Sequence, residues 1–207
     1  MERVRQFISA SIAGMLIGIG GTVFLSQQNL VVGSFLFAIG LFSIIAFELQ
    51  LFTGKIGYLI FRKPIYYIEL TITWFGNLTG TYLSAWMVQH TRIYDGISER
   101  VAKIAAVKLG DHFLSVFILA ILCGLLMFIA VDAYRTMQGS LLKAIAIFVP
   151  VMVFILSGFE HVIANMFYFS LAKVWDGHCL FTIVVTTLGN SVGGLLIPVY
   201  LKLFRLR

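Results

Sequence analysis

The amino-acid sequence predicts an all-α integral membrane protein that forms a single membrane domain, residues 1–207. Its residues are 60% hydrophobic and only 12% charged, whereas a soluble domain carries about 25% charged residues. The apolar residues fall into six runs of about 20 residues, the length that an α-helix needs to cross a bilayer. The two halves of the chain also carry similar motifs at similar spacing. Because no polar stretch is long enough for a soluble domain, we expect little beyond the membrane region.

The six runs predict six transmembrane helices, with one further helix in the longest connection. That connection, 89–111, has apolar residues at helical spacing, which predicts a short helix lying in the membrane interface. The other connections are mostly short. The predicted spans are, approximately, 7–25, 31–52, 65–88, 112–132, 141–170 and 178–203.

Basic residues predict the orientation of the chain, because cytoplasmic loops of membrane proteins are enriched in Lys and Arg. Of the 15 Lys and Arg residues, ten lie in cytoplasmic segments and five outside if the N-terminus is cytoplasmic. We therefore expect both termini in the cytoplasm and the protein in a bacterial cytoplasmic membrane, surrounded by lipid. These loops explain the net charge of +6, and no nucleic-acid partner is expected.

The two halves of the chain share a pair of motifs. An acidic residue precedes a G-N-x-x-G motif by 29 residues in the first half (Glu48 to Asn77) and by 30 in the second (Glu160 to Asn190). The amide side chains of these two asparagines could bond across helices or line a pore. The motifs are ELQLFTG at 48–54, FGNLTGT at 75–81, FEHVIANMF at 159–167 and LGNSVGG at 188–194.

This duplication predicts an inverted repeat. Each half, about 7–88 and 112–203, holds three helices, and an odd number makes the second half enter the membrane from the opposite face. Solute pathways are typically built at the interface of such repeats, from discontinuous helices. We expect the second and fifth helices to be broken. In the second helix, Thr53 and Gly54 permit a non-helical turn.

Several polar side chains lie beside the expected breaks. Glu48 precedes the first break, and aligning the halves pairs it with Glu160; both acids could cap broken backbone. His161 follows Glu160 in an apolar run, where ionisable residues usually face a bundle interior or an aqueous path. His161 is therefore a candidate proton donor or acceptor, with a purely structural histidine as the alternative. Asn165 lies one turn beyond and could bond the same partners.

The motifs ELQLFTG, SGFEHVIANMF and LGNSVGG, in this order, resemble the signatures of the formate/nitrite transporter family. The resemblance covers about 7–203. It implies six helices per protomer, an aquaporin-like protomer fold with its own pore, and a homopentamer. It also implies transport of small monovalent anions of weak acids, namely formate, nitrite or hydrosulfide, and in some members acetate or lactate.

The resemblance assigns polar residues to the pore. His161 falls on the central pore histidine of the family, and Thr53 falls on the threonine that faces it from the broken-helix loop. Asn190 falls on an asparagine expected near that histidine. Lys108 matches a lysine close to the outer vestibule, where we expect an exposed charge that raises the local anion concentration.

The resemblance also assigns apolar residues to the pore. Leu51 and Phe52 precede the threonine, as loop residues do in the family, and the positions that resemble its constrictions are Phe37, Leu41 and Phe154. A bare charge is costly at such a constriction. A weak acid lessens that cost by taking a proton, and the central histidine, with its facing threonine, is best placed to relay it.

Two other functions remain open from the sequence. One is an aquaporin-like pore for neutral solutes, in which the histidine only offers hydrogen bonds. The other is a membrane subunit that transports nothing. Enzyme activity is not expected, because HExxH is absent and no glycine-rich phosphate loop occurs in the right context. We expect no metal and no cofactor, and the predicted partners are the small anion, protons, lipid and further copies of the chain.

Overall fold

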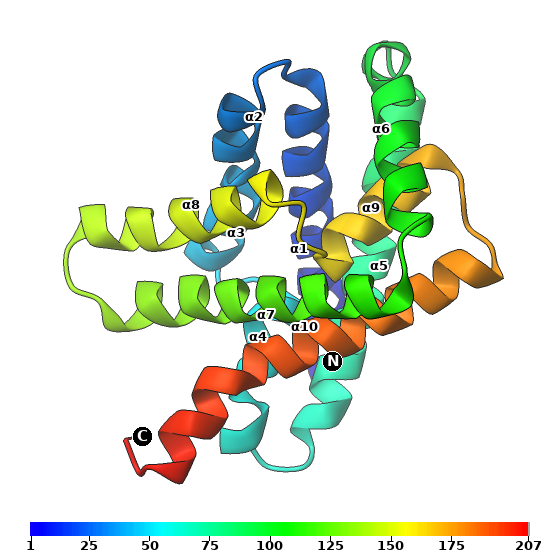
Figure 1. Ribbon diagram of the computed structural model, residues 1–207. Helices are drawn as coiled ribbons and strands as arrows, with labels where there is room; N and C mark the ends of the chain where they lie inside the picture. The colour runs from blue at the N-terminus through cyan, green and yellow to red at the C-terminus, as the bar shows by residue number, and fades with distance from the viewer. Residues whose placement is uncertain (207) are drawn as a thin grey trace.

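The computed structural model of the chain describes residues 1–206, and those residues form helices and no strands (Figure 1). In chain order the helices are α1 (Glu2–Ser26), α2 (Leu30–Phe37), α3 (Ile39–Ala46), α4 (Phe52–Lys55), the 3-10 helix η1 (Ile56–Phe61), α5 (Tyr66–Gln89), α6 (Ile93–Leu109), α7 (Phe113–Thr136), α8 (Ser140–Leu156), α9 (Val162–Ala172) and α10 (Gly177–Leu203).

Three helices are long and apolar enough to cross a membrane, judged by length and composition over the described part of the chain. These helices are α1, α7 and α10. The predicted span 31–52 is divided into α2 and α3, and the predicted span 141–170 is divided into α8 and α9. A helix, α6, is present in the connection 89–111, where the spacing of apolar residues predicted one.

The break in the first half lies before Thr53, so the expected non-helical turn at Thr53 and Gly54 is wrong. The chain leaves α3 after Ala46, and both residues lie in the short helix α4. The backbone turns at Glu48, which has a φ of 53°, and is extended at Leu51.

The Asn77 side chain, reaching from α5, holds this extended segment in place. It accepts a hydrogen bond from the Phe52 N–H (2.9 Å) and donates one to the Gln50 carbonyl (2.8 Å). These are the peptide groups on either side of Leu51. The position of the break is therefore set by a side chain far along the sequence, which local turn propensity does not reveal.

The break in the second half is held in the same way by Asn190 of α10. Its side chain accepts a hydrogen bond from the Val162 N–H (2.9 Å) and donates one to the Glu160 carbonyl (2.8 Å). His161, between those two residues, is extended, as Leu51 is in the first half. Each asparagine donates its remaining N–H to a carbonyl on the other long helix of its half. Asn77 donates to the Ala10 carbonyl, and Asn190 donates to the Ala120 carbonyl.

This matching set of hydrogen bonds corrects two expectations. It pairs Gln50 with Glu160, and Leu51 with His161, so the alignment of Glu48 with Glu160 is wrong by two residues. The asparagines, rather than the two acids, bind the broken backbone. The sequence left open whether the asparagines bond across helices or line a pore, and these contacts are bonds across helices.

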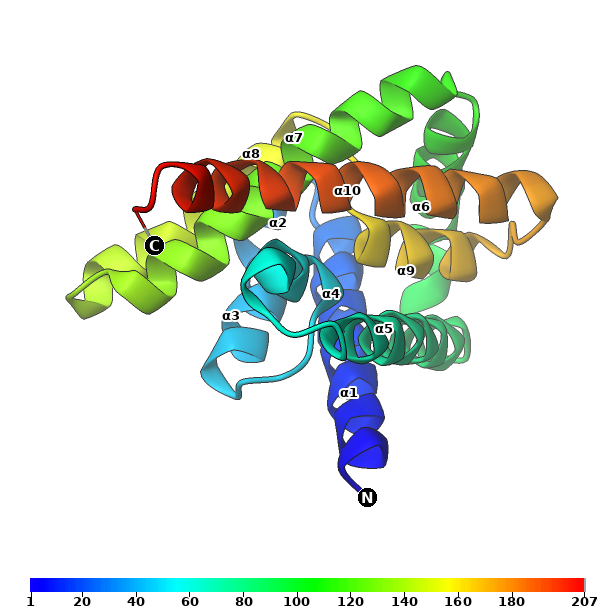
Figure 2. The same ribbon diagram turned by 90° about the horizontal axis from the view of Figure 1, so that it is seen from below.

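Each half is built on one long helix pair that packs closely. The α1–α5 and α7–α10 pairs make the most extensive contacts in the molecule, and in Figure 1 the two pairs run in different directions. Glycines make this approach possible. A Cβ added at Gly80 would overlap the Ser11 carbonyl oxygen, and one added at Gly193 would overlap the Ile121 carbonyl oxygen. Seen from below, α10 lies across α7 and alongside α9 (Figure 2).

Gly193→Ala is expected to destabilise the protein by about 1–3 kcal/mol or more, because the added methyl group meets rigid backbone. Gly96→Ala is the matched control. Gly96 lies inside α6 with no atom near its missing Cβ, so alanine should be neutral or stabilise the protein by up to about 1 kcal/mol. Thermal unfolding of both purified variants in mild detergent measures the difference. Equal midpoints would contradict the glycine-packing argument.

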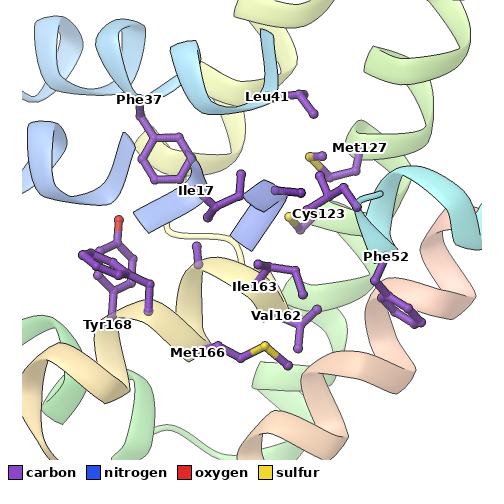
Figure 3. Packing of buried hydrophobic residues seen from close by; sticks show 14 of the residues in the cluster. Ile17, Phe37, Leu41, Phe52, Cys123, Met127, Val162, Ile163, Met166 and Tyr168 are labelled. Atoms are coloured by element: carbon purple, nitrogen blue, oxygen red, sulfur yellow. The ribbon is translucent and has the colours of Figure 1, made fainter. Parts of the chain in front are cut away.

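The buried core lies where the two halves meet. Figure 3 shows side chains from several helices converging there, with Phe37 of α2 and Leu41 of α3 near Met127 of α7 and Ile163 of α9. All four side chains are almost fully buried. The broken segments therefore bring their polar residues into a largely apolar interior.

Candidate functional site

His161 occupies the N-terminus of α9, directly after the break. Its Nδ1 accepts a hydrogen bond from the Ala164 N–H (3.2 Å), and its Nε2 lies 2.9 Å from the Thr53 hydroxyl oxygen. Since Nδ1 is an acceptor, a neutral imidazole carries its proton on Nε2 and donates it to Thr53. Both side chains are about 1% exposed. The Thr53 hydroxyl keeps its own hydrogen available for another acceptor.

Aromatic rings cover one side of this pair. The Phe154 ring stacks on the His161 ring with centroids 5.4 Å apart. Phe37 meets Phe154 edge to face, with centroids 6.0 Å apart. These rings offer no strong hydrogen bonds, so a polar solute that reaches the imidazole on this side meets few compensating groups.

Two hollows open in the protein near this pair. The first, which we call the Lys108 hollow, has a volume of about 320 Å³, and its lining includes Lys108, Phe154, Glu160, His161 and Asn165. The second, the Lys55 hollow, has a volume of about 810 Å³, and its lining includes Leu41, Leu51, Gly54, Lys55, Tyr66 and Glu69.

The Thr53–His161 hydrogen bond connects the lining of the Lys108 hollow to a residue next to the lining of the Lys55 hollow. His161 lines the Lys108 hollow, whereas Thr53 is followed by Gly54, which lines the Lys55 hollow. Thr53 and Phe37 line neither hollow and are buried between helices. Phe52 is buried as well, with its backbone N–H held by Asn77.

Lys108 is not the exposed charge that we expected. Its side chain is 13% exposed, and its ammonium donates to Glu160 Oε2 at 2.9 Å. Asn165 donates to the same oxygen at 2.5 Å rather than sharing a partner with His161. The packing of α6 on α9 brings the lysine to the acid. The Asn165 Oδ1 atom is buried and has no hydrogen-bond partner in the described structure.

Lys108→Met is expected to destabilise the protein by about 3–5 kcal/mol, because it leaves the Glu160 carboxylate buried without a cation. The double variant Lys108→Met with Glu160→Gln should recover most of that loss, since no buried charge remains. Chemical unfolding of the purified variants measures both. A single variant as stable as the wild type would show that the ion pair does not stabilise the fold.

Gln50 was not among the residues that the sequence predicted for the site. The Lys55 ammonium donates a hydrogen bond to the Gln50 side-chain oxygen, beside the Lys55 hollow. The signal was available in the repeat, because Gln50 precedes Leu51 as Glu160 precedes His161. Aligning the halves on the acidic residues hid this relation. Of the predicted site residues, Glu48 lies at the rim, exposed, in the lining of the Lys55 hollow.

Comparisons with known proteins give one consistent family. The family model described as "Formate/nitrite transporter" matches residues 1–204. The formate channel BtFdhC of Bacillus thuringiensis is 29% identical over 181 residues, which cover 79% of this chain and 68% of that protein. The chain spans about two thirds of the length of the first curated relatives it matches.

Two solved structures have the same fold as this chain. One, described as an FNT family ion channel, has a TM-score of 0.87 and 24% identity, over 98% of this chain and 90% of that one. The other, described as a pentameric formate channel with formate bound, has a TM-score of 0.81 and 22% identity, over 100% of this chain and 98% of that one.

Proposed function

The chain belongs to the formate/nitrite transporter family, and on that premise we propose that it passes small monovalent anions of weak acids, such as formate, nitrite or hydrosulfide, across a membrane. The observation that carries the proposal is the Thr53–His161 hydrogen bond between the two hollows. A solute crossing from one hollow to the other meets a hydroxyl and an imidazole as the polar groups in an apolar surround. No enzymatic reaction is part of the proposal.

The proposed architecture has six spans arranged as an aquaporin-like inverted repeat. In it, α2 with α3 forms the second span and α8 with α9 the fifth, each interrupted beside the pathway. The matching hydrogen bonds of Asn77 and Asn190 support this arrangement. We further propose a homopentamer in which every protomer has its own pore, in line with the pentameric formate channel that shares the fold.

In the proposed mechanism the anion loses water where the apolar side chains narrow the path. Those side chains are Phe37, Leu41, Leu51, Phe52 and Phe154. An unprotonated anion is costly there, because nothing replaces its hydration. The weak acid therefore crosses as the neutral species after taking a proton: His161 takes up a proton from water in the Lys108 hollow, passes it to the anion, and so returns to the neutral imidazole.

The polar residues around the path then have separate roles. The free hydrogen of the Thr53 hydroxyl donates to the solute, while His161 donates to Thr53. Asn190 positions His161 by holding the peptide groups on both sides of it. Lys108 and Glu160, as a buried pair with Asn165, form the polar wall of the outer vestibule.

Proteoliposome flux tests the proposal. The purified protein should pass formate, nitrite or hydrosulfide faster than protein-free liposomes, and an inward proton gradient should increase uptake. Acetate and lactate define the upper size limit. Flux that does not respond to a pH gradient, with equal passage of neutral solutes, would instead identify an aquaporin-like pore. No flux of any solute would contradict transport.

The same vesicles test sidedness. We propose that both termini are cytoplasmic and that the membrane is a bacterial cytoplasmic membrane, as the distribution of basic residues predicts. The Lys55 hollow then faces the cytoplasm and the Lys108 hollow faces outside. Protease digestion of a terminal tag in sealed right-side-out vesicles distinguishes this orientation from its inverse.

A further inference from the structure

The two broken segments carry equivalent pairs of side chains with different charges. In the second half, Glu160 accepts a hydrogen bond from Asn165, five residues later. In the first half, Gln50 accepts one from Lys55, again five residues later. The hydrogen bonds of Asn77 and Asn190 already place Gln50 opposite Glu160 in the repeat. The acid of one half therefore corresponds to a neutral amide in the other.

This exchange leaves the two lysines in different electrostatic states. The Lys108 ammonium lies 2.9 Å from the Glu160 carboxylate, which cancels most of its charge. The Lys55 ammonium bonds to a neutral amide. In the described structure no carboxylate lies within hydrogen-bond distance of it, and that of Glu69, at 3.9 Å, is 42% exposed to solvent. Water screens such an exposed carboxylate, so it neutralises Lys55 only weakly.

The surroundings of Lys55 add positive charge. The lining of the Lys55 hollow contains four basic and two acidic side chains: Lys55, Arg62, Lys63 and Arg135, against Glu48 and Glu69. Lys55 itself is 21% exposed, so part of it remains reachable from the hollow. A volume of about 810 Å³ leaves room for a small anion with some of its water. A concave surface with excess charge of one sign concentrates ions of the opposite sign.

We propose that the Lys55 hollow contains an anion-binding site in which the Lys55 ammonium holds a small monovalent anion before it reaches Thr53 and His161. The class of anion rests on the proposed function; the existence of the site rests on the charges and contacts of Lys55. The neutral Gln50 is what leaves the ammonium available. Lys108 offers no equivalent site, because the Glu160 carboxylate occupies its ammonium.

The proposal predicts that the formate concentration at half-maximal flux differs between the two sides of the membrane. Formate added on the side of the Lys55 hollow should reach half-maximal flux at a lower concentration than formate added on the other side. Lys55→Gln should raise that lower concentration by at least about tenfold, the minimum expected when a hydrogen bond to a charged group is lost. Gln50→Glu should have an effect of the same direction and size, because it places a carboxylate where the amide oxygen now bonds Lys55.

The experiment measures initial formate flux from each side of uniformly oriented proteoliposomes. Lys202→Gln is the matched control: it removes one positive charge of the same kind from an exposed position in the lining of neither hollow. Size-exclusion chromatography confirms that each variant assembles as the wild type does. Wild-type flux with equal half-saturation on both sides, or with both variants unchanged, would overturn the anion site and leave the proposed function intact.

If the wild type passes no formate, a binding measurement tests the anion site directly. Formate carries one carbon-bound hydrogen, so saturation-transfer NMR reports its contact with the purified protein. We expect a signal for the wild type and for Lys202→Gln that falls by at least about half in Lys55→Gln and Gln50→Glu, following the same charge argument. The same signal in all four proteins would overturn the site, whatever the flux experiment shows.

Discussion

Replacing His161 with phenylalanine is expected to abolish most anion flux while the protein still assembles. Phenylalanine keeps a flat ring to stack on Phe154, but it removes the imidazole nitrogen that meets Thr53. If His161 relays a proton, flux should fall on the order of a hundredfold, as when a general acid or base is lost. Formate flux under a proton gradient, at equal amounts of assembled protein, measures the loss.

His161→Asn separates the transport role from the structural one. Asparagine is a favoured residue at a helix N-terminus, so it can replace the acceptor that the imidazole offers to the Ala164 N–H. Its shorter side chain should not reach Thr53. The phenylalanine variant should lose about 1 kcal/mol of stability and the asparagine variant less, while both lose flux. Full flux in His161→Asn would show that His161 acts only as a helix cap.

Asn190→Leu is expected to lower the yield of folded protein strongly. Leucine fills a similar volume but makes no hydrogen bonds, so three backbone groups lose their partner: the Val162 N–H and the carbonyls of Glu160 and Ala120. Asn190 is completely buried, so water cannot replace it. Each unsatisfied buried group costs about 1–3 kcal/mol, and together they amount to several kcal/mol. The fraction of monodisperse protein after extraction, and its unfolding midpoint, measure the effect.

Ser191→Ala is the control for that experiment. Ser191 is the next residue on the same helix, and its hydroxyl bonds to the Thr187 carbonyl, within α10. Its loss should change stability by about 0.5–1.5 kcal/mol at most. Similar midpoints for Asn190→Leu and Ser191→Ala would refute the positioning role of Asn190.

The sequence predicted the starts of three long helices closely because apolar run length is a local property. The starts of α5, α7 and α10 fall within about one residue of the predicted spans. The first break was misplaced because its position depends on Asn77, which reaches Gln50 from 27 positions further along the chain. No local signal at Thr53 and Gly54 contains that information.

The site was predicted in part, and for a similar reason. The resemblance placed Thr53 opposite His161, and the two side chains are in hydrogen-bond contact. The burial of Lys108 could not be predicted, because it depends on how α6 packs on α9. The pore roles assigned to Phe37, Leu41 and the other apolar residues remain predictions for transport measurements.

Because Asn77 and Asn190 hold the backbone of the two broken segments, the conformation of each segment does not depend on which residue lies at its centre. Within its broken segment each asparagine, Asn77 or Asn190, binds main-chain atoms on both sides of the central residue, so these hydrogen bonds do not depend on the central side chain. The two halves of the chain can therefore carry different residues at this position, Leu51 in one and His161 in the other, with the same backbone conformation around each. Only one of the two equivalent positions, that of His161, then carries a group that can exchange a proton. Leu51→His tests whether the other position tolerates such a group.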